Sequence, residues 1–166
     1  IILLKEKQPR IHRDDIFRTF SGIKLMPGAK ELVNDLREKG IYVAIISAGV
    51  DLFVSTIASM LEVDDWIANG FEFDDDGWLT ADGIVRLSAW DKGTVISKML
   101  KTIGCSPENL VSVGDSVMDL SMQVEGSRFI GFNPTRETAI DGFEKAGVPV
   151  VPSKDLDLLR PFLDLE

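Results

Sequence analysis

The sequence is poor in the two residue types that most often hold zinc. Its 166 residues include one cysteine, Cys105, and one histidine, His12. A single cysteine cannot form an internal disulfide, which is typical of a reducing compartment and leads us to expect a cytoplasmic protein. Because no Cys/His cluster is present, zinc chemistry and a Cys-His nucleophile pair are both disfavoured.

The sequence also lacks an excess of positive charge and any long apolar run. Its formal net charge is -9 with a pI near 4.6, which argues against a general binder of nucleic acid or of an anionic membrane. No apolar run is long enough to span a bilayer, and no signal peptide is visible. The length and a hydrophobic content of 45% suit one domain with a sizeable core. Nothing in the sequence reveals an oligomeric state.

Helix-like and strand-like patterns alternate along most of the chain. Periodicity and end signals predict helices over 11–20, 27–40, 51–61, 92–103 and 136–146 and from about 155. Short apolar runs predict strands over 41–46, 110–113, 128–132 and 148–151, and a hairpin that joins 66–73 to 78–79. This order predicts an α/β fold with one open, mostly parallel Rossmannoid sheet and helices on both faces.

Two of these helices are expected to bury a stripe of apolar side chains. The predicted inward residues are Phe53, Ile57, Met60 and Leu61 in the first, and Val95, Ile96, Met99, Leu100 and Ile103 in the second.

Two acids follow the predicted strand 110–113. This strand stops at Gly114, and Asp115 and Asp119 come next with three residues between them. Ligands of parallel α/β sheets bind at the carboxyl ends of strands, and Mg²⁺ is held by one or two carboxylates together with phosphate oxygens. The spacing therefore suits a metal-assisted phosphate site. The plainer alternative is a solvated loop with Asp119 near a helix start, where the helix dipole favours it.

Two further signals come at the ends of core elements. Ser47 follows the predicted strand 41–46 and precedes Ala48 and Gly49, so a hydroxyl and free backbone N–H groups there can cradle an anion. Lys92 opens a helix, where the positive end of the helix dipole adds to its own charge. The plainer alternatives are a turn serine and a surface lysine preceded by an N-capping Asp91.

These signals, in this order, resemble the haloacid dehalogenase superfamily, and within it the phosphoserine phosphatase-like branch. The second motif of the family matches Ile45-Ile46-Ser47-Ala48-Gly49, the third matches Lys92, and the fourth matches Gly114-Asp115-Ser116-Val117-Met118-Asp119. The similarity extends over residues 20 to 160. Met118 departs from the pattern, because phosphoserine phosphatases usually have Asn there.

The resemblance implies a Mg²⁺-dependent phosphomonoesterase of small phosphorylated metabolites, with phosphoserine the best single guess. An aspartate would attack the phosphoryl group, and water would hydrolyse the aspartyl-phosphate. Ser47, Ala48 and Gly49 would bind the phosphoryl oxygens, and Lys92 would stabilise nucleophile and phosphate. Asp115 would ligate Mg²⁺, and Asp119 would support the metal or orient Lys92. The alternatives are a related phosphosugar phosphatase or phosphotransferase, and a non-catalytic module that binds phosphate and metal.

The first motif of the family, Asp-x-Asp after an apolar strand, is not found ahead of Ser47. Asp74-Asp75-Asp76 mimics it but comes between the second and third motifs and reads as a hairpin turn. Asp14-Asp15 follows a charged segment and reads as a helix start. We therefore expect the nucleophile to lie upstream of Ile1, and this chain alone to be inactive. Residues 1–20 are expected to be the remnant of a small helical cap, and residues 21–166 the core domain.

Overall fold

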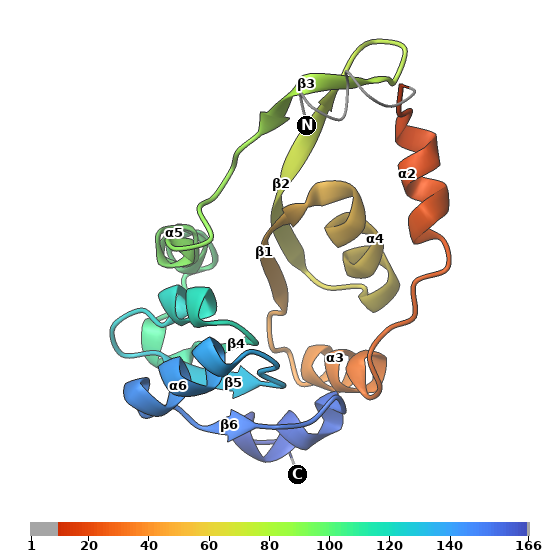
Figure 1. The fold of residues 1–166 in the computed structure, drawn as a ribbon. Coiled ribbons are helices and arrows are strands. Elements are labelled where there is room, and N and C mark those ends of the chain that lie inside the picture. The colour runs from red at the N-terminus through yellow and green to blue at the C-terminus, as the bar shows by residue number, and fades with distance from the viewer. Residues whose placement is uncertain (1–9, 166) are drawn as a thin grey trace. The chain divides into compact units, whose positions relative to one another are not determined.

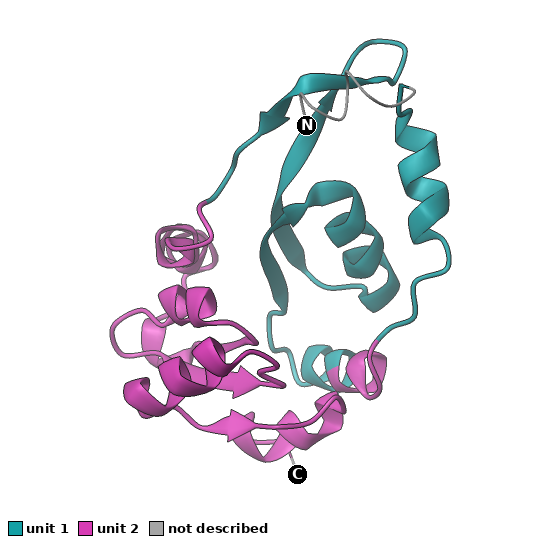
Figure 2. Cartoon of the chain, viewed as in Figure 1, with its two compact units in different colours: residues 1–25, 33–87 teal, residues 26–32, 88–166 magenta. Residues whose placement is uncertain are grey.

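In the computed structural model, residues 10–165 are described, and they belong to two compact units (Figures 1 and 2). Unit 1 comprises Ile1–Leu25 and Val33–Leu87, and unit 2 comprises Met26–Leu32 and Ser88–Glu166. Each unit contains its own three-stranded sheet. The α/β class with parallel pairing is confirmed, but the described strands pair in two sheets and not in the single sheet that the sequence predicts.

The sheet of unit 1 combines a parallel pair with a hairpin. Strands β1 (Ala44–Val50) and β2 (Asp65–Phe73) are parallel and are connected by helix α4 (Asp51–Leu61), which packs on both. Strand β3 (Leu79–Ile84) runs antiparallel to β2. The predicted hairpin is confirmed: the Asp74 carboxylate accepts the Trp78 N–H at 2.8 Å, and Gly77 takes a φ of +86° that glycine tolerates best.

Two further helices belong wholly or partly to unit 1. Helix α2 (Arg13–Phe20) begins with a capping box between His12 and Asp15, as expected for a helix start. Its last residue, Phe20, packs edge-on against Phe53 of α4 at 5.3 Å between ring centroids. Helix α3 (Ala29–Glu38) crosses the boundary between the units at Leu32. No helix in the described range is long and apolar enough to cross a bilayer.

Unit 2 is built on three parallel strands. These are β4 (Val111–Gly114), β5 (Arg128–Phe132) and β6 (Val150–Val151), with β5 in the centre. The helical elements are α5 (Lys92–Ile103), α6 (Glu137–Ala146) and the 3₁₀ segments η1 (Pro107–Asn109), η2 (Val117–Met122) and η3 (Leu156–Phe162). Phe129 and Phe143 are almost fully buried between β5 and α6. Gly131 makes this packing possible, because a Cβ there would lie 2.5 Å from the Phe143 ring.

Unit 2 is discontinuous in sequence. The Leu156 N–H at the start of η3 donates to the Pro27 carbonyl at 2.9 Å. Gly28 follows with a φ of +73°, and a Cβ there would lie 2.6 Å from the Asp157 backbone nitrogen. The segment Met26–Leu32 is therefore fitted closely against the C-terminal part of the chain.

Several sequence-based expectations are wrong in detail. Strand β1 starts three residues later than predicted, because the Ile41 N–H caps the end of α3 by donating to the Leu36 carbonyl. Phe53 and Ile103 are not buried, with 40% and 38% of their surfaces exposed. The predictions for Leu61, Ile96 and Leu100 are confirmed, because all three are buried. The other buried side chains of these helices, which were not predicted, are Val54 and Ala58 of α4 and Lys92 of α5. The part of the predicted cap remnant that falls on residues 1–9 lies outside the described residues.

Candidate active site

The first part of the candidate site is the buried lysine at the start of α5. Asp91 caps this helix by accepting the Thr94 N–H, as the plainer reading of Asp91 predicted. Lys92 is only 8% exposed, so it is not an ordinary surface lysine. Its Nζ forms an ion pair and hydrogen bond with Oδ1 of Asp119, which is 6% exposed. The sequence-based pairing of these two residues is therefore seen directly.

Asp119 also organises the loop that carries Asp115. Its Oδ2 accepts the backbone N–H groups of Asp115 and Ser116 at 3.1 and 3.0 Å and the Ser116 hydroxyl at 2.8 Å. Ser116 and Asp119 form a capping box at the start of η2. The two oxygens of Asp119 are thus bound by Lys92 on one side and by the loop at Asp115 and Ser116 on the other. Direct ligation of a metal by Asp119 stays a prediction.

The electrostatics of this pair favour the charged form of the carboxylate. Burial alone raises the pKa of Asp119, but the hydrogen bond and positive charge of Lys92, with the hydrogen bonds from Ser116, outweigh it. The pKa of Asp119 consequently lies below its ordinary value. The ionised carboxylate of Asp119 thus holds the Lys92 side chain in a fixed position.

Glycines allow the elements around this pair to approach closely. A Cβ on Gly114 would lie 2.3 Å from the Asp119 Cβ, and a Cβ on Gly93 would lie 2.6 Å from the Ser121 carbonyl oxygen. The Ser121 hydroxyl accepts the Lys92 backbone N–H at 3.2 Å and donates to the Met118 carbonyl at 2.7 Å. The start of α5 is therefore docked directly on η2. Sequence reasoning missed Ser116 and Ser121, although the Ser116-x-x-Asp119 spacing is a capping-box signal.

Asp115 differs from Asp119 in being exposed. Within residues 10–165, no side chain or backbone donor is paired with its carboxylate, so its oxygens are accessible to a hydrated cation. The described residues contain no group of three or more His, Cys, Asp or Glu side chains suited to a metal. Mg²⁺ needs only one or two protein carboxylates because it keeps several waters. The exposed carboxylate of Asp115 fits that requirement.

The second part of the candidate site lies in unit 1, at the end of β1. Ser47 pairs with Ala68 of β2, and the next pair is Val50 with Asn69, so Ala48 and Gly49 bulge out of the ladder. The Ser47 Oγ accepts the Gly49 N–H at 3.0 Å. Accepting this bond leaves the hydroxyl proton free to donate to a ligand. The bulge thus gathers a hydroxyl and irregular backbone, but the Gly49 N–H is not free as the sequence predicted, because it donates to Ser47 Oγ.

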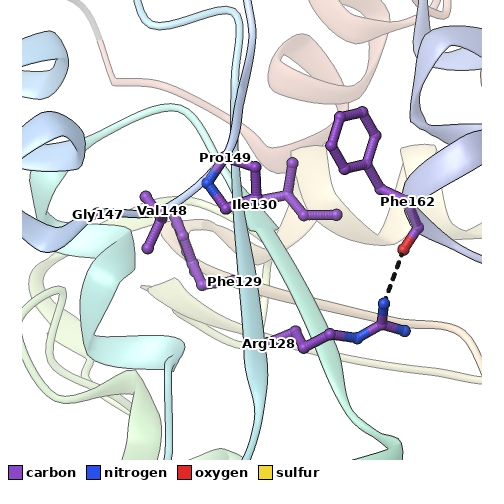
Figure 3. A pocket seen from close by; sticks show the side chains of 7 residues that line it. All are labelled: Arg128, Phe129, Ile130, Gly147, Val148, Pro149 and Phe162. Atoms are coloured by element: carbon purple, nitrogen blue, oxygen red, sulfur yellow. Dashed lines mark hydrogen bonds between the residues drawn. The ribbon is translucent and has the colours of Figure 1, made fainter.

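The structure thus brings Lys92, Asp115 and Asp119 together in unit 2, and Ser47, Ala48 and Gly49 together in unit 1. That the two groups meet around one phosphoryl group stays a prediction. A pocket in unit 2 contains none of these residues (Figure 3). It is lined by Arg128, Phe129, Ile130, Gly147, Val148, Pro149 and Phe162.

Comparisons with known proteins agree with the fold and the motifs. The profile of the haloacid dehalogenase-like hydrolases matches residues 4–123. A phosphoserine phosphatase of Archaeoglobus fulgidus is 37% identical over 119 residues, which cover 70% of this chain and 34% of that protein. A phosphoserine phosphatase of Methanocaldococcus jannaschii is 34% identical over 108 residues, 63% of this chain and 50% of that protein. The chain thus spans a third to a half of the length of these relatives.

Solved structures of phosphoserine phosphatases are similar to this chain in fold. A phospho-aspartyl intermediate analogue of phosphoserine phosphatase superposes with a TM-score of 0.79 at 28% identity, covering 93% of this chain and 71% of the other. An apo phosphoserine phosphatase superposes with a TM-score of 0.80 at 26% identity, covering 93% and 74%. The chain belongs to the haloacid dehalogenase-like hydrolases. Within that family it is phosphoserine phosphatase-like.

Proposed function

We propose that the protein is a Mg²⁺-dependent phosphomonoester hydrolase that acts on a small phosphorylated metabolite, with phosphoserine the first candidate. The observation that carries the proposal is the buried Lys92–Asp119 pair, whose carboxylate also accepts the backbone N–H of the exposed Asp115. A buried lysine held by an aspartate is costly to maintain for stability alone. It is, however, a suitable partner for a negatively charged group that reacts.

Each residue has a distinct part in this proposal. Lys92 stabilises negative charge on the phosphoryl oxygens and on the attacking carboxylate, and Asp119 keeps it in position. The Ser47 hydroxyl and the backbone N–H groups of Ala48 and Gly49 donate to the phosphoryl oxygens. Asp115 would hold Mg²⁺, which when bound supplies further positive charge at the transferred group.

The covalent course follows from the same family. One similar structure is described as a phospho-aspartyl intermediate analogue, which supports a path in which a carboxylate is phosphorylated and water then hydrolyses the acyl phosphate. Our expectation that the nucleophilic aspartate precedes Ile1 stays a prediction. So does the assignment of residues 1–20 to a helical cap that covers the leaving group.

The substrate is supported by the relatives rather than by contacts. Another similar structure is a substrate-bound phosphoserine phosphatase complex, at a TM-score of 0.80 and 26% identity. Met118 stands where we expect Asn in that branch, so a phosphosugar phosphatase and a phosphotransferase remain the alternatives. A module that binds phosphate and metal without catalysis is a third alternative.

Phosphate release from a panel of phosphomonoesters, with and without Mg²⁺, tests the proposal on the native polypeptide. We expect Lys92→Ala and Asp115→Asn each to lower turnover by at least about 100-fold, as loss of an electrostatic stabiliser does. Near-normal turnover in either folded variant would refute its role. No phosphate release from any ester, with phosphate still bound, would instead favour the non-catalytic module.

A further inference from the structure

The bulge at the end of β1 has an anchor that the motifs do not include. Asn69 of β2 is half-buried and lies opposite Val50 in the β1–β2 ladder. Its Nδ2 donates to the Ala48 carbonyl at 3.2 Å and to the Leu87 carbonyl at 3.1 Å. Its Oδ1 accepts the backbone N–H groups of Arg86 at 2.8 Å and Leu87 at 3.0 Å. One side chain thus ties the bulge to the segment that follows β3.

This amide has no hydrogen-bonding capacity left over. An asparagine side chain offers two N–H donors and two acceptor lone pairs, and Asn69 uses all four. Turning the amide over would set its oxygen against two carbonyls and its N–H groups against two N–H donors. The four hydrogen bonds therefore allow only one orientation of the Asn69 amide. An isosteric aspartate would lack the two N–H donors that bind the Ala48 and Leu87 carbonyls.

The contact with Ala48 determines where the Gly49 N–H points. The Ala48 carbonyl and the Gly49 N–H belong to the same peptide group, and residues 10–165 contain no cis peptide bond. In a planar trans peptide these two groups point in opposite directions. Holding the carbonyl toward Asn69 therefore turns the Gly49 N–H to the other side, where Ser47 Oγ lies at 3.0 Å.

Strand pairing between β1 and β2 cannot fix the direction of the Gly49 N–H. From Ala68 to Asn69 is one step on β2, but the paired positions on β1 are Ser47 and Val50. Ala48 and Gly49 are the extra residues, so strand pairing does not fix their peptide planes. A side chain has to do so.

A second contact holds the other end of the same turn. Arg86 Nη1 donates to Asp51 Oδ2 at 3.0 Å and to the Ala68 carbonyl at 2.8 Å, and Asp51 starts α4 one residue after the bulge, following Val50. Gly70 leaves room for this pair, because a Cβ there would lie 2.2 Å from Asp51 Oδ2. The residues between Ser47 and α4 are therefore anchored at both ends.

We infer that Asn69 is the positioning residue of the phosphate cradle, and that its amide fixes the peptide plane that presents the Gly49 N–H beside the Ser47 hydroxyl. The inference rests on the proposed function, since it takes Ser47 to Gly49 as the phosphate-binding segment. It adds a specific role for a residue outside the four motifs.

The test uses the 166-residue chain, inorganic phosphate as the probe, and the backbone amide signal of Gly49 in NMR spectra. Asn69→Asp is compared with Asn109→Asp, which makes the same change at an exposed position in unit 2. We expect Asn69→Asp to weaken phosphate binding by about fivefold or more, the loss of one to two hydrogen bonds, and to speed solvent exchange of the Gly49 amide. Asn109→Asp should change neither. Asn69→Ser removes the same donors without adding charge and serves if the aspartate variant does not fold.

The outcomes separate the inference from the proposed function. If the unsubstituted 166-residue chain shows no phosphate response at Gly49, the assignment of Ser47 to Gly49 as the phosphate-binding segment is wrong, and so is that part of the proposed function. If the native chain responds and a folded Asn69 variant binds phosphate equally well, the inference is wrong and the cradle stands. A purely structural Asn69 would lower the unfolding midpoint while leaving the phosphate affinity of the folded variant unchanged.

Discussion

The Lys92–Asp119 pair makes a specific prediction about stability. Both side chains are 9% exposed, so solvent cannot replace the partner that a substitution removes. Breaking a buried pair by removing one partner costs about 3–5 kcal/mol, whereas an exposed pair contributes about 0–1 kcal/mol. Lys92→Ala should therefore lower the free energy of unfolding by about 3–5 kcal/mol.

Urea denaturation followed by circular dichroism measures this change. With a slope of about 2 kcal/mol per M, the midpoint should fall by roughly 2 M. The matched control is Lys98→Ala, which removes an exposed lysine from the same helix and should change stability by no more than about 0.5 kcal/mol. Equal midpoints for the two variants would refute the claim that the ion pair is buried and that removing Lys92 leaves Asp119 without a partner.

Three further predictions concern the same unit and the acidic turn. The pKa of Asp119 is lowered in the folded state, so its contribution to stability is present above the unfolded pKa and is lost as pH falls through the folded pKa. Acid titrations of the free energy of unfolding should therefore show that Asp119→Asn loses less stability than the unsubstituted chain below about pH 4. Gly114→Ala should destabilise by about 1–3 kcal/mol through overpacking against Asp119, while Gly22→Ala, with open space at its Cβ, should not; equal melting temperatures would contradict the contact. Asp74→Asn keeps the oxygen that accepts the Trp78 N–H and should leave turnover of the native polypeptide unchanged; complete loss would reassign the turn to catalysis.

The elements that the sequence predicted well have local causes. The bounds of α4 and α5 agree with the prediction at both ends, and β5 does as well. In α5 the cap on Asp91 and the left-handed Gly104 mark the two ends, and both signals are visible in the sequence. The pairing of Lys92 with Asp119 agrees with one of the two roles that the family resemblance implied for Asp119.

The features that were missed depend on contacts distant in sequence. The face that α4 buries is decided by the packing of Val54 and Ala58, and its Phe53 meets Phe20 instead of the core. The role of Asn69 likewise cannot be predicted until its partners on β1 and after β3 are known. Periodicity alone cannot rank such contacts, since each involves a residue that is more than fifteen positions away.

The hydrogen bond between Leu156 and Pro27 bears on how the polypeptide reaches its native state. A ribosome delivers Met26–Leu32 long before the C-terminal residues against which that segment fits. Closing so long a loop is entropically unfavourable, and folds rich in such contacts form slowly. Unit 2 can therefore complete its folding only after Leu156 has been translated, and cleavage after Leu87 would cut its covalent link to the segment Met26–Leu32.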